Sequence, residues 1–275
     1  MKNLVARLRE ISKKAVRNPG KLKQSIKDPE KREHHIDRLR LAFKKDRINR
    51  DVERGEMSKR LATVFDEDQG QIERYQQEIE HNHEFYSVYN ERREELENEG
   101  VLGGTTSTLD TQTMYVVCRI LEPEIIVETG VRYGAFDAHI TAALHKNGHG
   151  LMYGIELPDS IKKFEFGYLI PEEYREQWVC ELGDSKNVLP ELLNEVDSVD
   201  VFLHDSLHSR DHMQWEYSAV YPKISNGGVL ASHDVLMNNV YQKYVDKTDI
   251  DWTRVGNVGV GRKRADNSLP MSALP

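Results

Sequence analysis

Short hydrophobic runs alternate with segments of helical periodicity through the second part of the chain. The runs predict strands at 125–128, 151–155, 178–181, 199–203 and 228–232. The periodic segments predict helices at 108–121, 136–145, 186–196 and 212–220. Strands joined through helices of this length lie parallel, with right-handed crossovers that place helices on both faces of the sheet. We therefore expect an α/β fold with a Rossmann-like, doubly wound, mostly parallel sheet.

The end of the chain departs from this alternation. Residues 252–255 and 258–261 flank Gly256–Asn257, a pair that favours a two-residue hairpin turn. Because a hairpin joins antiparallel strands, the pattern predicts that the sheet gains an antiparallel strand at its C-terminal end.

The first hundred residues are more polar and predict a helical N-terminal extension. Leu4, Leu8 and Ile11 recur at helical spacing, and further helices are predicted at 32–41 and 71–97. These helices are too polar to form a core alone, so they either lie on the body of the protein or are partly disordered. Gly103–Gly104 is the predicted boundary. The expected parts are a basic helical arm (1–50), an acidic helical extension that could form a lid (51–104) and the sheet domain (105–275).

Charge separates the arm from the rest of the chain. The 275 residues include 38 basic and 46 acidic side chains, a net charge of −8. Residues 1–50 hold 17 basic and 6 acidic side chains, a net of +11, whereas the other 225 residues hold 21 and 40, a net of −19. The acidic body lacks the basic groove that nucleic acids require, so we expect no nucleic-acid partner.

The basic arm has three open interpretations. It makes peripheral contact with an anionic membrane surface as an interfacial helix, or docks on an acidic body in the same or a neighbouring subunit. The third is RNA binding, for which Phe43 is the one aromatic residue that could stack on a base. We expect a homo-oligomer.

Three features predict a cytoplasmic protein, which a lipid-binding arm would bring to the inner membrane face. No hydrophobic run approaches the roughly 20 residues that span a bilayer. The basic start is not followed by the unbroken hydrophobic stretch of a secretory signal. Cys118 and Cys180 are too few for a disulfide framework and lie in hydrophobic segments, as reduced core thiols do.

The first candidate site is the turn from Glu128 to Gly134, directly after a predicted strand. Two glycines, Gly130 and Gly134, let the backbone approach a ligand at the carboxyl edge of the sheet. The spacing lacks the three glycines typical of a dinucleotide turn, and the carboxyl of Glu128 suits an ammonium group better than a phosphate. An ordinary strand-to-helix turn is the alternative.

Acidic residues also follow the next two strands. Glu156 lies 26 residues after Gly130, where a doubly wound fold places an acid that binds ribose hydroxyls. Asp184 and Ser185 follow the third strand, beside the expected position of an adenine. A helix N-cap explains Asp184 and Ser185 equally well.

The densest polar cluster follows the fourth and fifth strands. Asp205 and His208 come after one strand, and His233 and Asp234 after its neighbour, so all four should meet at one sheet edge. Asp205 and Asp234 could bind a hard divalent cation such as Mg²⁺ through oxygen. Alternatively, a histidine could act as a general base. A nitrogen-rich zinc site is the third arrangement, and it would use His204, His208, His212 and His233.

Together these residues resemble the class I S-adenosylmethionine-dependent methyltransferases, over about residues 108–263. Residues 127–134 resemble the first motif of that family, Glu156 its ribose-binding acid, and 183–185 its adenine-side motif. The stretch 199–235 is similar to the branch of macrocin-type sugar O-methyltransferases and cephalosporin-hydroxylase-like proteins. His233 departs from this branch, whose sugar-modifying members often carry a second acid at that position.

The resemblance implies direct transfer of a methyl group from S-adenosylmethionine to a hydroxyl of a sugar or glycan-type small molecule. It implies cofactor contacts from Glu128, Gly130, Tyr133, Gly134, Glu156, Asp184, Ser185 and Asp205. His208 is the first choice for the general base and His233 the second. Asp205 and Asp234 would hold Mg²⁺ or another divalent cation that orients the acceptor hydroxyl.

Several rival functions remain open. The acceptor could instead be a lipid, a lipid-carried glycan, a natural product or a protein. The sheet domain could also be a non-catalytic cofactor-binding module in an assembly, and a nicotinamide oxidoreductase is the remote alternative.

Overall fold

The computed structural model describes residues 50–102 and 106–265, together with 33, 34, 36–38, 41 and 44. The predictions that rest on Leu4, Leu8 and Ile11, and the boundary at Gly103–Gly104, lie outside the described residues. The described residues between 33 and 44 are helical.

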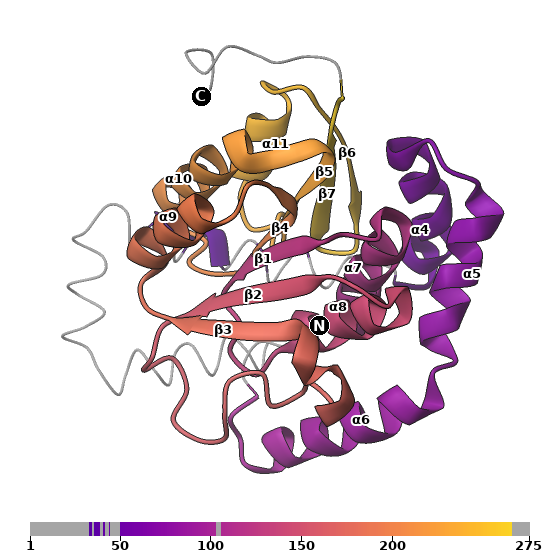
Figure 1. The fold of residues 1–275 in the computed structure, drawn as a ribbon, viewed down its shortest axis with the longest axis vertical. Coiled ribbons are helices and arrows are strands. Elements are labelled where there is room, and N and C mark those ends of the chain that lie inside the picture. The colour runs from indigo at the N-terminus through magenta and orange to yellow at the C-terminus, as the bar shows by residue number, and fades with distance from the viewer. Residues whose placement is uncertain are drawn as a thin grey trace.

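Seven strands form one sheet in the order β3-β2-β1-β4-β5-β7-β6 (Figure 1). The first five strands run parallel, and β7 is antiparallel to both β5 and β6. The strands are β1 (Ile125–Thr129), β2 (Leu151–Glu156), β3 (Trp178–Leu182), β4 (Val199–His204), β5 (Ile224–Ser232), β6 (Ile250–Val255) and β7 (Val258–Lys263). The prediction of a doubly wound, mostly parallel sheet with a C-terminal hairpin is confirmed.

Helices cover both faces of this sheet (Figure 1). One face carries α7 (Thr108–Leu121) and α8 (Ala135–Asn147), and the other carries α9 (Ser185–Glu195), α10 (Arg210–Val220) and α11 (Val240–Val245). Two short 3-10 helices, η1 (Glu172–Gln177) and η2 (Tyr221–Lys223), precede β3 and β5. The first residues of α7 are held by a capping box in which Ser107 and Asp110 each accept the backbone N–H of the other.

The core has two layers because neighbouring strand residues point to opposite faces. On β1, Ile126 packs with α7 and α8, whereas Val127 packs with α9 and α10. On β4, Val201 packs in the layer of Ile126, and Phe202 packs in the layer of Val127. Burial on both faces explains why these strands read as continuous hydrophobic runs in the sequence.

Three helices before α7 share the larger of these two core layers. They are α4 (Arg50–Phe65), α5 (Gln69–Glu80) and α6 (His83–Asn98). Met57, Leu61, Ile72 and Phe85 are fully buried in it. The polar composition of this extension is therefore compatible with order, because most of its large hydrophobic residues pack against the sheet domain.

The prediction of one helix over 71–97 is wrong. The helical conformation is interrupted at His81 and Asn82. There the Asn82 side chain accepts the backbone N–H of Phe85 at 3.0 Å and caps the start of α6. Asparagine favours this N-cap position because its side-chain oxygen replaces a missing backbone acceptor. Helix α4 lies within the expected helical extension, although no individual helix was predicted there.

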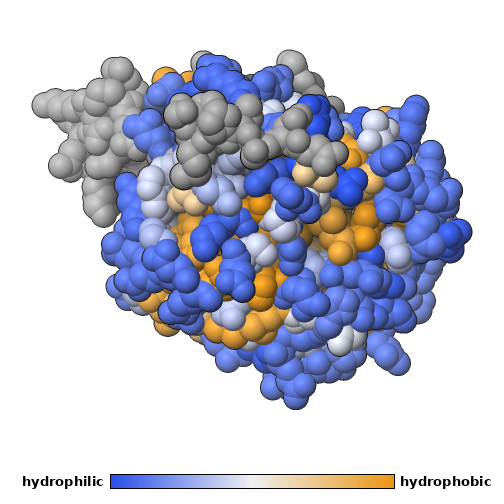
Figure 2. All heavy atoms as spheres, turned by 45° about the horizontal axis from the view of Figure 1, so that its top comes forward, coloured by the Kyte–Doolittle hydropathy of each residue, from blue (hydrophilic) through white to orange (hydrophobic). Residues whose placement is uncertain are grey.

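The visible surface is largely hydrophilic, with hydrophobic side chains gathered between polar ones (Figure 2). Among the described residues, no helix has both the length and the hydrophobicity that crossing a bilayer demands.

Candidate active site

The turn after β1 has a backbone that only glycine adopts easily. Gly130 has a φ of 100°, and a Cβ at this position would lie 2.4 Å from the carbonyl oxygen of Asp205. Gly134 has a φ of 76°, and its Cβ would lie 2.8 Å from Cα of Gly167. Both glycines are therefore required by close backbone packing at the carboxyl edge of the sheet.

Glu156 ties this turn to the end of β2. Its two carboxylate oxygens accept the backbone N–H groups of Arg132 and Leu157, each at 2.7 Å. Each oxygen keeps a second lone pair, so hydrogen bonds to a vicinal diol remain chemically feasible. The predicted ribose-binding acid thus also shapes the glycine turn.

Glu128 lies in the interior, with 1% of its surface exposed, and its carboxyl hydrogen bonds with Asp137 of α8. Burial raises the pKa of Glu128 well above its ordinary value, and the neighbouring carboxylates of Asp137 and Asp205 add to this rise. Burial also raises the pKa of Asp137 to about 7, although the indole N–H of Trp178 donates to Asp137 at 2.7 Å. Two adjacent buried carboxyls cannot both ionise, so the pair keeps a proton near neutral pH.

The three other predicted cofactor residues lie around the same edge. Tyr133 is 7% exposed and its ring meets Phe164 edge-on at 6.5 Å. Asp184 caps α9 by accepting the backbone N–H of Lys186, as the structural alternative predicted. Ser185 lies within 3.3 Å of a ring nitrogen of His212.

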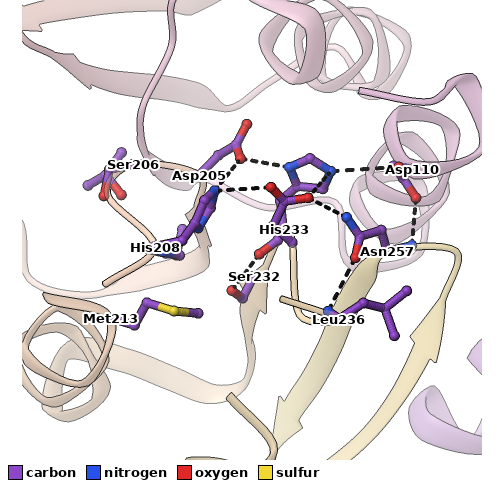
Figure 3. A network of polar contacts seen from close by, with 12 residues as sticks. Asp110, Asp205, Ser206, His208, Met213, Ser232, His233, Leu236 and Asn257 are labelled. Atoms are coloured by element: carbon purple, nitrogen blue, oxygen red, sulfur yellow. Dashed lines mark hydrogen bonds and ion pairs between the residues drawn. The ribbon is translucent and has the colours of Figure 1, made fainter. Parts of the chain in front are cut away.

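The ends of β4 and β5 bring four predicted residues together. His204 pairs with Ser232 in the sheet register, so the residues that follow them leave the sheet side by side. Nδ1 of His233 lies 2.7 Å from Oδ1 of Asp205. Nε2 of His208 lies 3.5 Å from Oδ1 of Asp205 and 3.6 Å from Oδ2 of Asp234. Figure 3 shows these contacts as one continuous polar network.

Two further residues complete the network and were missed from the sequence. Asp110, at the start of α7, lies 3.6 Å from Nε2 of His233 and accepts the backbone N–H of Asn257 at 2.8 Å. The Asn257 side chain donates to Asp234. Ser107 and Asp110 form a capping-box pattern, and Asn257 belongs to a hairpin pattern. Local structure therefore explained the presence of these residues, and nothing in the sequence marked them as part of a functional site.

The carboxylates around His233 determine its charge. Burial lowers the pKa of His233, but the carboxylates of Asp205, Asp234 and Asp110 outweigh burial and raise this pKa well above its ordinary value. A histidine that keeps both ring protons has no lone pair with which to accept a proton or bind a metal. This arrangement favours His208 over His233 as the base.

The cluster has the donor set for a divalent cation. Asp205, His208 and His233 offer ligand atoms within 4.8 Å of one another. Ligand atoms that each lie about 2.1 Å from one ion are separated by about 3 to 3.5 Å, close to the spacings of His208 from Asp205 and Asp234. Because His233 keeps both ring protons, Asp205 and His208 are the members of this group that could hold an ion, and Asp234, 3.6 Å from His208, lies outside it. A site of four histidines is not formed, because His204 and His212 both bind Glu216.

The fold that carries this site is shared with known proteins. Residues 127–235 match the family model described as a methyltransferase domain. The chain has the methyltransferase fold. Three solved structures with this methyltransferase fold are each 12% identical to the chain, with a TM-score of 0.51.

The three structures are bacterial and fungal methyltransferases with cofactor or its product bound. They are the O-methyltransferase TomG of tomaymycin synthesis from Streptomyces achromogenes with SAM, an O-methyltransferase from Bacillus cereus with SAH, and SAH-bound PaMTH1 from Podospora anserina. The alignments cover 64%, 64% and 66% of this chain and 89%, 91% and 88% of the respective structures. No curated protein sequence compared with the chain matches it significantly. The family-model match supports an enzyme of the methyltransferase class, and the solved structures show the shared fold.

The N-terminal segment reaches the rim of this site. Arg210, two residues after His208, pairs with Glu33 at 2.9 Å and with Asp37 at 2.9 Å. Asp37 is 1% exposed. The described part of the basic arm therefore contacts the sheet domain through its acidic residues, and its basic residues play no part in this pairing.

Proposed function

We propose that the chain is an S-adenosylmethionine-dependent O-methyltransferase that acts on a hydroxyl of a sugar or glycan-type small molecule. The observation that carries this proposal is the position of Nε2 of His208 between the carboxylates of Asp205 and Asp234. These groups lie on the same sheet edge as the glycine turn. A base beside a turn that lets a ligand approach the backbone is the arrangement that transfer to a hydroxyl requires.

The cofactor would be held by the turn and by the acids that follow β1, β2 and β3. Gly130 and Gly134 give the turn its tight backbone path, along which the cofactor would lie. Glu156 offers its remaining lone pairs to ribose hydroxyls, and Asp184 and Ser185 would lie at the adenine side. When bound, S-adenosylmethionine supplies a methyl group made electrophilic by its sulfonium. Glu128 and Tyr133 line the interior side of the turn, and Asp205 closes it through its backbone.

The acceptor hydroxyl would be deprotonated by His208. Its Nε2 accepts the proton, and Asp205 and Asp234 stabilise the imidazolium that results. Much of the rate enhancement in a direct displacement comes from positioning the two reactants, so the shape of the site matters as much as the base. The imidazolium of His233 donates to Asp205 and keeps that carboxylate in a fixed orientation.

A polyhydroxylated acceptor fits the chemistry of the site. Five charged or polar side chains meet there, namely Asp110, Asp205, His208, His233 and Asp234. Each carboxylate accepts hydrogen bonds and carries no proton to donate, so the site matches a ligand that brings several hydroxyl donors. A lipid-carried glycan, a natural product and a protein side chain are the rival acceptors.

We also propose that Asp205 and Asp234 hold a divalent cation such as Mg²⁺ beside His208, whose Nε2 stays free to act as the base. The ion would lower the pKa of a bound hydroxyl and orient it. Isothermal titration of the chelator-treated protein with Mg²⁺ and Mn²⁺ tests this site directly. Binding that is lost in Asp234→Asn supports it, and absence of binding in the unmodified protein overturns it.

The decisive experiment for the function combines cofactor binding with acceptor screening. Titration calorimetry should detect binding of S-adenosylmethionine and of S-adenosylhomocysteine, and the substitution Glu156→Ala should weaken the binding of both. Incubation with methyl-labelled S-adenosylmethionine and a panel of sugars, nucleotide sugars and glycolipids should label one class. Control acceptors without hydroxyls should stay unlabelled.

The outcomes separate the rival functions. Labelling of a lipid, natural product or protein in place of sugars keeps the methyltransferase and changes the acceptor. Cofactor binding without transfer to any acceptor indicates a binding module. Failure to bind S-adenosylmethionine, with binding of a nicotinamide cofactor, overturns the proposal.

A further inference from the structure

The loop that joins β2 to η1 (residues 157–171, the β2–η1 loop) packs against the glycine turn. The backbone N–H of Gly167 donates to the carbonyl of Arg132 at 3.2 Å. The backbone N–H of Leu169 donates to the carbonyl of Tyr133 at 2.9 Å. The turn therefore takes part of its backbone position from this loop.

Side chains of the loop contact the same turn. The ring of Tyr133 meets that of Phe164 edge-on at 6.5 Å, and the ring of Phe164 lies 4.6 Å from that of Tyr168. Ile170 is fully buried, and its Cγ1 would lie 3.3 Å from a Cβ at Gly134. A shift of the loop would thus move the residues that we assign to the cofactor.

Arg92 of α6 holds the β2–η1 loop, which lies beside α6 in Figure 1. Its Nη1 donates to the carbonyl oxygens of Tyr168 at 2.9 Å and of Ile170 at 2.5 Å. Its guanidinium carbon lies 5.5 Å from the centre of the Tyr168 ring. Because Ile170 is buried, its carbonyl depends on a donor from the protein. A charged guanidinium with its donors in a rigid fork suits two neighbouring carbonyls.

Two acidic residues of α6 make further contacts with the loop. The hydroxyl of Tyr168 donates to Glu95, and Lys163 pairs with Glu99. Arg92, Glu95 and Glu99 are three and four residues apart, so they share one face of the helix. Exposed pairs such as that of Lys163 contribute little, so the main support comes from Arg92.

We propose that Arg92 is a positioning residue for the cofactor. Through the carbonyls of Tyr168 and Ile170 it holds the β2–η1 loop, and the loop holds the glycine turn in the shape that binds S-adenosylmethionine. A turn fixed before binding loses less conformational freedom when the ligand arrives. The effect on cofactor affinity rests on the proposed function, whereas the effect on the loop does not.

Hydrogen exchange of the ligand-free full chain tests the loop. Arg92→Met keeps a long side chain and removes the donors. We expect the backbone N–H groups of Gly167 and Leu169 to exchange at least about 10-fold faster, while that of Val127 in β1 exchanges as before. A 10-fold change corresponds to about 1.4 kcal/mol, which a hydrogen bond from a charged donor supplies. Unchanged exchange at both loop positions would overturn the proposal.

Titration calorimetry with S-adenosylhomocysteine tests the cofactor side. The Kd of Arg92→Met should rise about 10-fold. The matched control is Arg93→Met on the same helix, where Arg93 pairs with Glu97 at 3.4 Å, and its Kd should stay within about 2-fold. Leu61→Ala removes a buried side chain of α4, so it lowers stability without touching the loop, and its Kd should also stay within about 2-fold. An unchanged Kd in Arg92→Met contradicts positioning, and an equal rise in Leu61→Ala reduces Arg92 to a structural role.

Two more variants complete the test. Arg92→Lys keeps a charged donor without the planar fork, so its Kd should lie between those of the unmodified protein and Arg92→Met. Binding no better than that of Arg92→Met would contradict the role of the donors. If Arg92→Met does not fold, Tyr168→Ala removes the ring between Arg92 and Phe164. It should speed exchange at Leu169 and raise the Kd about 3-fold, and no change in either overturns the proposal.

The measurements keep the two proposals apart. If the unmodified protein does not bind S-adenosylhomocysteine, the proposed function fails, and hydrogen exchange alone decides whether Arg92 holds the loop. If the unmodified protein binds it and Arg92→Met binds equally well, the proposed function stands and the role of Arg92 is rejected.

Discussion

Nδ1 of His233 lies 2.7 Å from Oδ1 of Asp205, and this contact joins the ends of two neighbouring strands. Asp205 follows β4 and His233 follows β5, and the backbone N–H of His233 donates to the carbonyl of His204 at 2.9 Å. The sheet therefore sets the distance between the two side chains. The pair places a fixed positive charge beside the base proposed for methyl transfer.

Asp205→Asn tests the importance of the negative charge of Asp205 in this pair. The amide keeps the size of the side chain but removes the negative charge that faces both His208 and His233. We expect initial rates of methyl transfer to fall at least about 100-fold, the lower range for loss of a general acid or base, with binding of S-adenosylhomocysteine nearly unchanged. The control is Asp251→Asn, an exposed acid paired with Arg264 on β6, whose rates should equal those of the unmodified protein. Equal rates in both variants would rule out a role for Asp205.

Gly130→Ala tests the close approach in the glycine turn. A side chain here meets a φ of 100° and a carbonyl oxygen 2.4 Å away, so the turn must open. Backbone strain alone costs about 1–3 kcal/mol, and cofactor binding should be lost. Gly55→Ala in α4 is the control, because nothing lies within 4 Å of its Cβ and alanine favours a helix by about 0.5–1 kcal/mol. Urea unfolding and calorimetry measure both effects, and a Gly130→Ala protein with normal binding would contradict the turn's role.

The raised pKa of Asp137 predicts a specific pH dependence of the free energy of unfolding. Its pKa is raised from 3.8 to about 7, mainly by burial, so the folded protein holds this proton more tightly than the unfolded chain does. The associated stability is present below about pH 3.8 and is lost as the pH rises toward 7, with a slope of at most about 1.4 kcal/mol per pH unit.

Asp137→Asn should remove that slope and keep the acceptor for Trp178. Because Glu128 titrates with the same sign, the measurement is the difference between the unfolding free energies of the two proteins from pH 4 to 8. The difference should grow in favour of the variant as the pH rises. A constant difference would show that Asp137 ionises normally.

Leu61→Ala tests whether α4 belongs to the core of the sheet domain. Leu61 is fully buried, so its truncation should lower the free energy of unfolding by about 2–5 kcal/mol and keep a single transition. Val52→Ala on the same helix is the control, since Val52 is 56% exposed and its truncation should change stability by less than about 0.5 kcal/mol. Two separate transitions in urea would instead indicate that 51–104 unfolds independently.

The site could be largely predicted because its main residues follow a simple rule of parallel sheets. Asp205, His208, His233 and Asp234 directly follow two buried strands, and the carboxyl ends of neighbouring parallel strands lie at one edge. Glu156 and the glycine turn were found by the same rule. Asp110 and Asn257 were missed because each already had a complete local explanation, as a capping residue and as a turn residue.

The sequence by itself determined the strands, the helices of the sheet domain and the residues that end each strand, because these follow from hydrophobic periodicity and turn chemistry over a few residues. Only the tertiary structure decided that β7 lies between β5 and β6, that one face of α4 packs into the core, and that Glu216 of α10 contacts His204 and His212. These relationships join residues distant in the chain, and they depend on which surfaces pack together and which buried polar groups must find partners.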